Sequence, residues 1–338
     1  MKKHVNIPIF IPFYGCPNAC VFCNQVKITG KPSFEKQSVI KDIDAALSTV
    51  DNNNQEAELA FFGGSFTALP EKEMLALLEI SDRYIAAGKI SCVRVSTRPD
   101  AISERILGVL ADHGVKTVEL GIQSFSDRVL AASNRGHNAL TSENACNAVK
   151  AFGLKLIGQM MIGLPFSTPE DEIYTAERIC GLKADGARVY PTVVFPDTAL
   201  MRMKNGGIYS PLSTEDAITR TSDVLDVFAR HSVPVIRIGL CANETLSDNR
   251  YHDNYHPSIG ELAMSRLYLK SMRRLLSEAK DIKGKEACFT VAKGRISQAI
   301  GQKRSNAVLL KEEYKFTRLS VIESPELNGY EITLKINP

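Results

Sequence analysis

Short apolar runs alternate with amphipathic stretches through the first 200 residues of the chain. The runs are apolar at consecutive positions, which is typical of strands buried on both faces of a parallel sheet. The window 38–50 instead repeats its apolar residues at helical spacing and predicts an amphipathic helix. Further helices are expected near 71–87, 101–112, 141–152 and 169–183, the last with Thr168 as its cap and Pro169 at its first position. Strands are expected near 7–13, 57–62, 91–97, 115–121, 154–162 and 187–195.

This alternation predicts an α/β fold in which helices cover a parallel sheet. Six strand–helix units indicate a partial (βα)6 barrel, because a complete barrel has eight. Such folds carry their reactive groups on loops beyond the carboxyl ends of the strands. Three motifs of chemical interest follow the first three strands: the cysteine loop 16–23, Gly63-Gly64 and Arg98-Pro99-Asp100.

A second region begins near residue 206, so we divide the chain into residues 1–205 and 206–338. Ser213 and Asp216 have the spacing of a helix cap and predict a helix at 214–231. Another helix is expected at 257–278, and apolar stretches near 286–292, 315–322 and 329–336 predict a small sheet. The second region is therefore expected to be an α+β accessory region.

Composition is that of an ordinary globular protein, with 44% apolar and 23% charged residues. The absence of an uninterrupted run of 18 apolar residues argues against a transmembrane helix. The apolar N-terminal run contains Pro8 and Pro12 and leads into Cys16, so it reads as a strand and not as a signal peptide. We expect a cytoplasmic protein without a membrane partner.

Eight cysteines are present, and three of them, Cys16, Cys20 and Cys23, lie within eight residues. Thiolates are soft ligands that select zinc or iron–sulfur clusters. A structural zinc site needs four ligands, so a zinc knuckle completed by a distant residue such as His4 is the alternative. Three thiolates on a four-iron cluster leave one iron open for a substrate or cofactor. The other cysteines, at positions 92, 146, 180, 241 and 288, lie in apolar surroundings and are expected to be core residues.

The spacing C-x3-C-x2-C, with Phe22 before the last cysteine, resembles the cluster loop of radical S-adenosylmethionine (SAM) enzymes. Over about residues 7–320, the chain resembles the radical SAM portion of the catalytic subunit of the elongator complex (Elp3). It is more distantly similar to oxygen-independent coproporphyrinogen oxidase. The motifs that carry the resemblance are FFGGSFTALP (61–70), STRPD (96–100), ELGIQSF (119–125), NRGH (134–137), MIGLPFST (161–168) and YHPSIGEL (255–262).

The resemblance implies a radical SAM enzyme with a 4Fe-4S cluster on Cys16, Cys20 and Cys23. SAM would be chelated by the open iron and cleaved by one electron to a 5′-deoxyadenosyl radical, which abstracts hydrogen from a substrate. It also implies a one-electron donor of the flavodoxin or ferredoxin type. The residue that faces the substrate is not identified.

Four residues match SAM-pocket positions of the family. The Gly63-Gly64 pair would let backbone carbonyls approach the methionine amino group, and its alternative is a plain strand-to-helix turn. Gln123 matches a glutamine of the SAM pocket. Arg135 matches an arginine that pairs with the SAM carboxylate, and its alternative is a surface arginine.

Two further positions depart from the family pattern. Ser96 stands where related enzymes often have a glutamate that faces the SAM ribose, and serine is shorter and uncharged. Gln159 stands where porphyrinogen oxidases have a ribose-binding aspartate. Its amide is expected either to hydrogen-bond SAM or to be a buried structural group.

Basic charge is concentrated late in the chain, where residues 261–320 hold 14 lysines and arginines against six acidic residues. Arg266, Lys270, Arg273 and Arg274 form a stripe on one predicted helix, which is either a solvated face or a surface for RNA phosphates. Elp3 acts on tRNA, which makes tRNA the candidate partner. Because the sequence ends at Pro338, we do not expect the acetyltransferase domain that Elp3 carries. The alternatives are a small-molecule enzyme like coproporphyrinogen oxidase and a non-catalytic zinc- or RNA-binding protein.

Overall fold

The computed structural model describes residues 3–17, 20–29, 34–51, 54–240 and 255–337. Its larger sheet is entirely parallel, and its seven strands are ordered as they occur in the sequence. The strands are β1 (Lys3–Ile11), β2 (Gln55–Gly63), β3 (Cys92–Thr97), β4 (Val115–Gln123), β5 (Lys155–Ile162), β6 (Gly186–Pro191) and β7 (Val235–Ile238).

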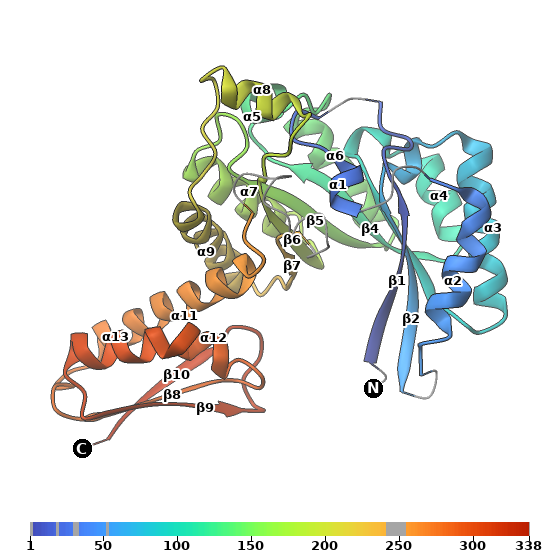
Figure 1. The fold of residues 1–338 in the computed structure, drawn as a ribbon. Helices are drawn as coiled ribbons and strands as arrows, with labels where there is room; N and C mark the ends of the chain where they lie inside the picture. The colour runs from blue at the N-terminus through green and yellow to red at the C-terminus, as the bar shows by residue number, and fades with distance from the viewer. Residues whose placement is uncertain (1–2, 18–19, 30–33, 52–53, 241–254, 338) are drawn as a thin grey trace.

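Helices cover the outer face of this curled sheet (Figure 1). They are α2 (Val39–Leu47), α3 (Glu71–Ala86), α4 (Glu104–Asp112), α6 (Ala139–Ala151), α7 (Pro169–Gly181) and α9 (Thr214–Arg230). Three shorter helices pack in separate small clusters outside the main apolar core: α1 (Gln25–Thr29), α5 (Asp127–Ala132) and α8 (Ala199–Asn205). Because sequential parallel strands with covering helices form an open curled sheet here, the predicted α/β partial barrel is confirmed.

Local signals set the helix ends where the sequence predicted them. Thr168 caps α7 in a capping box with Asp171, and Pro169 occupies the first turn. Ser213 caps α9 by accepting a hydrogen bond from the backbone N–H of Asp216. Each cap satisfies an amide that the helix itself leaves unpaired.

Alternate residues of each strand point outward into one large core beneath the helices. On β2 the outward residues include Leu59 and Phe61, and on β3 they are Val93 and Val95. The remaining residues of each strand point to the inner, concave face of the sheet. This alternation determines which residues are available to a site inside the barrel.

The sheet extends past residue 205, because the short β7 pairs with β6 in parallel. The sequence did not predict this four-residue strand. The predicted strand 187–195 also ends early, at Pro191 in β6. The division of the chain between residues 205 and 206 stays a prediction. One strand of the barrel sheet, β7, comes from the second of these two parts.

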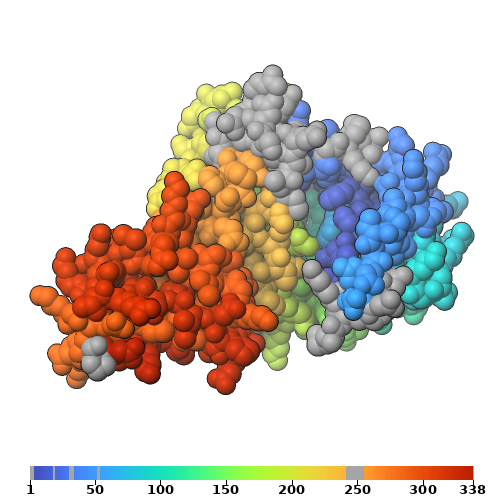
Figure 2. All heavy atoms as spheres, turned by 60° about the horizontal axis from the view of Figure 1, so that its bottom comes forward, coloured from blue at the N-terminus to red at the C-terminus, as the bar shows by residue number. Residues whose placement is uncertain are grey.

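A smaller module follows on the long helix α11 (Ile259–Glu278), which packs against α9. Figure 1 shows this module beside the barrel, and Figure 2 shows it as a separate lobe in orange and red. It has its own apolar core around Tyr268, Met272 and Phe289. No helix in the described ranges combines the length and apolar character needed to cross a membrane. The other elements of the module are β8 (Glu286–Ala292), α12 (Ile296–Ile300), α13 (Ser305–Tyr314), β9 (Arg318–Ser324) and β10 (Ile332–Asn337).

Candidate functional site

The loop that carries the three cysteines leaves the carboxyl end of β1 and rests on the loop after β2. The backbone N–H of Ser65 donates to the carbonyl of Tyr14 across 3.0 Å. A Cβ added to Gly64 would lie 2.0 Å from the Tyr14 oxygen and 2.5 Å from the Ile11 oxygen. Only glycine permits this backbone-to-backbone contact, so the Gly63-Gly64 pair supports the cysteine loop.

Gly15 and Gly63 complete this contact through their backbone conformations. Gly15 has φ +77°, and a Cβ there would lie 2.3 Å from the Ser65 oxygen. Gly63 has a backbone φ of +101°, a value that residues with a side chain rarely adopt. Gly64 and Gly15 thus make a close backbone contact in the turn after β2, while the role of the Gly63-Gly64 pair toward SAM stays a prediction.

The three thiols of the loop lie close enough to influence one another. Burial, followed by the neighbouring thiols of Cys20 and Cys16, raises the pKa of Cys23 to about 12. A buried, protonated thiol must lose its proton to become a metal ligand. Of the other cysteines, Cys146 and Cys180 are buried as predicted, Cys92 and Cys288 are partly buried, and Cys241 lies outside the described residues.

His4 is placed away from this loop. It begins β1, a nine-residue strand that spans roughly 30 Å, whereas Cys16 follows the other end of that strand. His4 Nε2 instead lies 3.0 Å from Glu58 Oε2. Within the described residues, no three His, Cys, Asp or Glu side chains are grouped as ligands of one metal ion. The geometry thus gives no support to a zinc site completed by His4.

Gln25 is a neighbour of the cysteine loop that the sequence reading missed. Its side chain is buried, and its Oε1 accepts a hydrogen bond from the backbone N–H of Phe13. Its Nε2 lies 4.0 Å from Cys16 Sγ. Its position two residues after Cys23 was the available signal. Gln25 can therefore fix the loop backbone and donate to a ligand thiolate.

Arg135 joins the cysteine loop to the end of β4. Its Nη1 lies 3.0 Å from Cys20 Sγ, and its Nη2 donates to the carbonyl of Gly121 across 2.7 Å. The residue is 6% exposed, which makes it a buried cation and not a surface arginine. Its Nε has no partner among the described residues, so this guanidinium has hydrogen-bonding capacity left for an anion.

Two sequence motifs meet at Arg135. Arg98, from STRPD, donates to the Arg135 carbonyl and pairs with Asp100, whose Oδ1 lies 3.0 Å from Arg98 Nε. His137, from NRGH, places its Nδ1 3.6 Å from Asp100 Oδ1. Burial and the charge of Arg135 lower the pKa of His137 to about 4, so the ring is neutral near pH 7. Arg98, Asp100 and His137 were quoted as motif residues, but their mutual contact was not predicted.

Gln123 ends β4 in a conformation that is rare for a residue with a side chain. Its φ is +67°, at an irregularity in the pairing of β4 with β5. It is 4% exposed, and its Oε1 has no hydrogen-bond partner among the described residues. A buried carbonyl oxygen without a partner is unfavourable, which indicates that a ligand or water completes this position.

Ser96 and Gln159 face the inner side of the sheet. Ser96 Oγ donates to Glu119 Oε2 across 3.2 Å, so a carboxylate from the neighbouring strand lies next to the serine. Gln159 is partly buried and lies in register between Gly121 on β4 and Arg188 on β6. Both residues thus share the inner face with Gly121, which contacts Arg135.

A buried ionic network crosses the inner face of four strands. Arg94 pairs with Glu58 and with Glu119, at 2.8 Å in each case. Arg188 Nη2 donates to Glu119 Oε1 across 3.0 Å, and its Nη1 lies 3.3 Å from the Tyr190 hydroxyl. The available signal was a charged residue inside each of the four strands β2, β3, β4 and β6. The network gives the barrel a polar interior that can orient a polar substrate.

The basic stripe on α11 is engaged within the protein. Arg266 pairs with Glu215 of α9, Lys270 with Asp223, Arg273 with Glu313 and Arg274 with Asp226. Each basic residue of the stripe thus has an acidic partner on a neighbouring helix, and Arg274 shares Asp226 with Arg230. The four side chains also remain 31%, 37%, 43% and 54% exposed, so the expectation of a solvated face or a surface for RNA phosphates stays a prediction.

Comparison with known proteins identifies the family. The Radical SAM superfamily profile matches residues 10–179, and a Radical_SAM C-terminal domain profile matches residues 184–270. An uncharacterized protein of Methanocaldococcus jannaschii is 26% identical over 239 residues, which are 67% of this chain and 72% of that protein.

Two further matches involve the family expected from the sequence motifs. The tRNA uridine(34) acetyltransferase of Methanocaldococcus infernus is 27% identical over 247 residues, which are 60% of this chain and 46% of that protein. The solved Elp3 structure from the same organism has a TM-score of 0.60 at 19% identity and covers 81% of this chain and 64% of that one. This match shows a shared fold. The chain belongs to the radical SAM superfamily and is a radical SAM enzyme.

Proposed function

We propose that the chain holds a 4Fe-4S cluster on Cys16, Cys20 and Cys23 and cleaves SAM reductively to act on a base in RNA, with tRNA as the leading candidate. The observation that carries the proposal is the contact of Arg135 with Cys20, on a loop held by the Gly63-Gly64 pair. The donor set fits the cluster, because three thiols at this spacing leave one iron open. The bound cluster and SAM would supply a 5′-deoxyadenosyl radical when one electron arrives from a flavodoxin or ferredoxin.

The residues of this chain would hold and orient SAM. Arg135 has a free Nε beside the cysteine loop and would pair with the SAM carboxylate. The unpartnered Oε1 of Gln123 would accept a hydrogen bond from SAM, and backbone carbonyls at Gly63 and Gly64 would approach its amino group. Ser96 and Gln159 would contact the ribose, with Glu119 supplying the nearby carboxylate that Ser96 lacks.

The polar barrel interior would receive the substrate. Glu119, Arg94 and Arg188 are fixed by mutual ion pairs, so they present oriented donors and acceptors without reorganisation. A nucleobase carries matching donors and acceptors on its edge. The RNA assignment is further supported by the similarity to a tRNA uridine(34) acetyltransferase. In this proposal, residues 1–205 form the catalytic part of the chain and residues 206–338 form the accessory part.

The test is a substrate search with the anaerobically reconstituted, reduced protein. Total RNA from cells that lack the protein should increase formation of 5′-deoxyadenosine, and nuclease treatment of the RNA should remove the increase. The Cys20→Ala variant serves as the blank, because it lacks a cluster ligand. Stimulation by the nuclease-resistant small-molecule fraction alone would contradict the RNA assignment and favour a small-molecule substrate.

A further inference from the structure

The accessory module contains a β-α-α-β unit with two adjacent parallel strands. β8 leads through α12 and α13 into β9, and β8 pairs with β9 from Glu286↔Arg318 to Ala292↔Ser324. The KH module of RNA-binding proteins is built on such a unit and clamps the nucleotide backbone with a Gly-x-x-Gly loop between the two helices. Here the corresponding loop is Gly301-Gln302-Lys303-Arg304.

Three of the four residues of this loop, Gly301, Lys303 and Arg304, have left-handed backbone conformations. Gly301 has φ +78°, and a Cβ there would lie 2.6 Å from Ser305 Oγ and 2.9 Å from Asn306 N. Arg304, at the fourth position, has φ +64°, a conformation that favours glycine. The fourth position therefore has the backbone conformation typical of glycine but carries a cationic side chain.

A buried amide secures the loop to the rest of the module. Asn306 is 5% exposed, and its Nδ2 donates to the carbonyl of Ser265 on α11 across 2.9 Å and to that of Ala299 on α12 across 3.1 Å. The loop is thus held between three helices. A ligand that binds there would meet a preformed backbone.

The charges at this loop are free, unlike those of the α11 stripe. Lys303 and Arg304 are exposed, and neither forms an ion pair with any residue that the structure describes. The first turn of α13 has no acidic residue, and its N-terminus has no side-chain cap. Two cations and an uncapped helix N-terminus together favour an anion.

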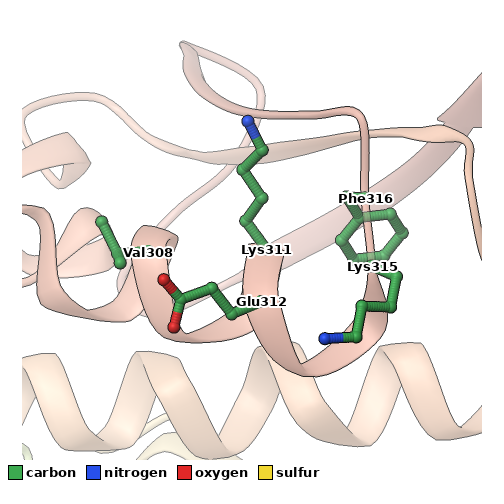
Figure 3. Close-up of a pocket in the computed structure, with 5 residues that line it drawn as sticks. All are labelled: Val308, Lys311, Glu312, Lys315 and Phe316. Carbon is green, nitrogen blue, oxygen red and sulfur yellow. The ribbon is translucent and has the colours of Figure 1, made fainter.

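The basic surface continues along α13. Arg304, Val308, Lys311 and Lys315 recur at spacings of three and four residues, which places them on one face of the helix. Figure 3 shows a shallow hollow there, lined by Val308, Lys311, Glu312, Lys315 and Phe316. Val308 is 50% exposed, so an apolar contact lies between cations. Alternation of this kind suits a chain that carries phosphates and bases.

We infer that residues 286–324 bind single-stranded RNA, with the phosphate backbone on the Gly301–Arg304 loop and along α13. The inference rests on the proposal that the substrate is RNA, and it names the surface that would hold this RNA. Backbone amides and cations dominate this surface and aromatic rings do not, so binding relies on phosphates more than on base stacking.

The test measures binding of a fluorescent 12-nucleotide RNA to the full chain by anisotropy. The variant Lys303→Asp/Arg304→Asp should bind at least tenfold more weakly, because two phosphate contacts are lost and two like charges introduced. Aspartate tolerates left-handed φ, so the loop backbone is preserved, and a thermal unfolding scan checks the fold. The log–log dependence of affinity on salt should become shallower by about 1.4, at about 0.7 for each phosphate contact.

The matched control is Lys41→Asp/Lys72→Asp, which makes the same change of charge on exposed residues of α2 and α3, in the barrel. It should leave the affinity within twofold of the wild type. Equal weakening by both double variants would overturn the inference. 5′-Deoxyadenosine formation without RNA, measured in the same preparations, should not change in the loop variant. RNA modification with unaltered binding in that variant would refute this surface while leaving the proposed function intact.

Discussion

The guanidinium Nη1 of Arg135 lies 3.0 Å from the Sγ of Cys20, although 115 residues separate the two in sequence. The contact joins the cysteine loop after β1 to the segment after β4. It places a buried cation beside the proposed cluster ligands, where it favours thiolate over thiol. It also locates the position at which an anionic group of SAM would be bound.

Replacement of Arg135 by alanine should weaken SAM binding to the reconstituted protein. A buried charge-assisted hydrogen bond is typically worth about 1.5–3 kcal/mol, so the dissociation constant should rise roughly 10- to 150-fold. Isothermal titration under anaerobic conditions measures the change. Arg135→Lys keeps the charge but lacks the planar guanidinium, so its dissociation constant for SAM should lie between those of the wild type and Arg135→Ala. SAM affinity equal to that of the wild type in Arg135→Ala would show that the residue has another role.

Gly64→Ala should disrupt the support of the cysteine loop. The new Cβ would lie 2.0 Å from the Tyr14 carbonyl oxygen, so the loop must move. We expect a loss of about 2 kcal/mol or more in the free energy of unfolding and a lower iron content after reconstitution. Gly108→Ala is the matched control, since a Cβ there meets nothing within 4 Å and the position is helical. That control should be neutral or stabilising by up to about 1 kcal/mol, and equal iron content in both variants would argue against a supporting role for Gly64.

Glu119→Gln should destabilise the barrel, because it leaves Arg94 and Arg188 without their shared carboxylate. Breaking a buried ion pair typically costs about 3–5 kcal/mol. The exposed pair of Arg105 and Glu71 provides the comparison, and Glu71→Gln should cost less than about 1 kcal/mol. Urea unfolding of both variants gives the two values. Similar small losses in both would mean that the inner network contributes little to stability.

Protonation of His137 should lower stability in acid. Its folded-state pKa is about 4 against 6.5 in the unfolded chain, so below pH 6.5 the unfolded state takes up the proton first. Stability from this residue is complete above pH 6.5 and is lost as the pH falls toward 4, by about 3 kcal/mol in all. The difference in unfolding free energy between wild type and His137→Asn should therefore shrink across that range. A difference that stays constant from pH 7.5 to 4.5 would exclude this linkage.

Features encoded locally in the sequence were predicted well. Helix α3 was expected at 71–87 and spans Glu71–Ala86, and strand β8 was expected and found at 286–292. The caps at Thr168 and Ser213 were also predicted, because a cap involves residues only three positions apart. Hydrophobic periodicity and capping are short-range signals that a single sequence contains.

Features that depend on distant partners were not predicted. The basic residues of α11 form a stripe by their spacing, but the sequence does not show that Glu215 and Asp223 of α9 face Arg266 and Lys270. In the same way, Arg94 and Glu119 are separate charges until adjacent strands place them together. Strand β7 is only four residues long and was missed because so short a run carries little periodicity.

The most direct test of the central claim is quantification of 5′-deoxyadenosine after the anaerobically reconstituted protein is reduced in the presence of SAM. We predict that the wild type carries about four irons per chain and forms 5′-deoxyadenosine and methionine, whereas Cys20→Ala forms neither. Stoichiometric zinc without 5′-deoxyadenosine, or S-adenosylhomocysteine as the sole product of SAM, would contradict the account.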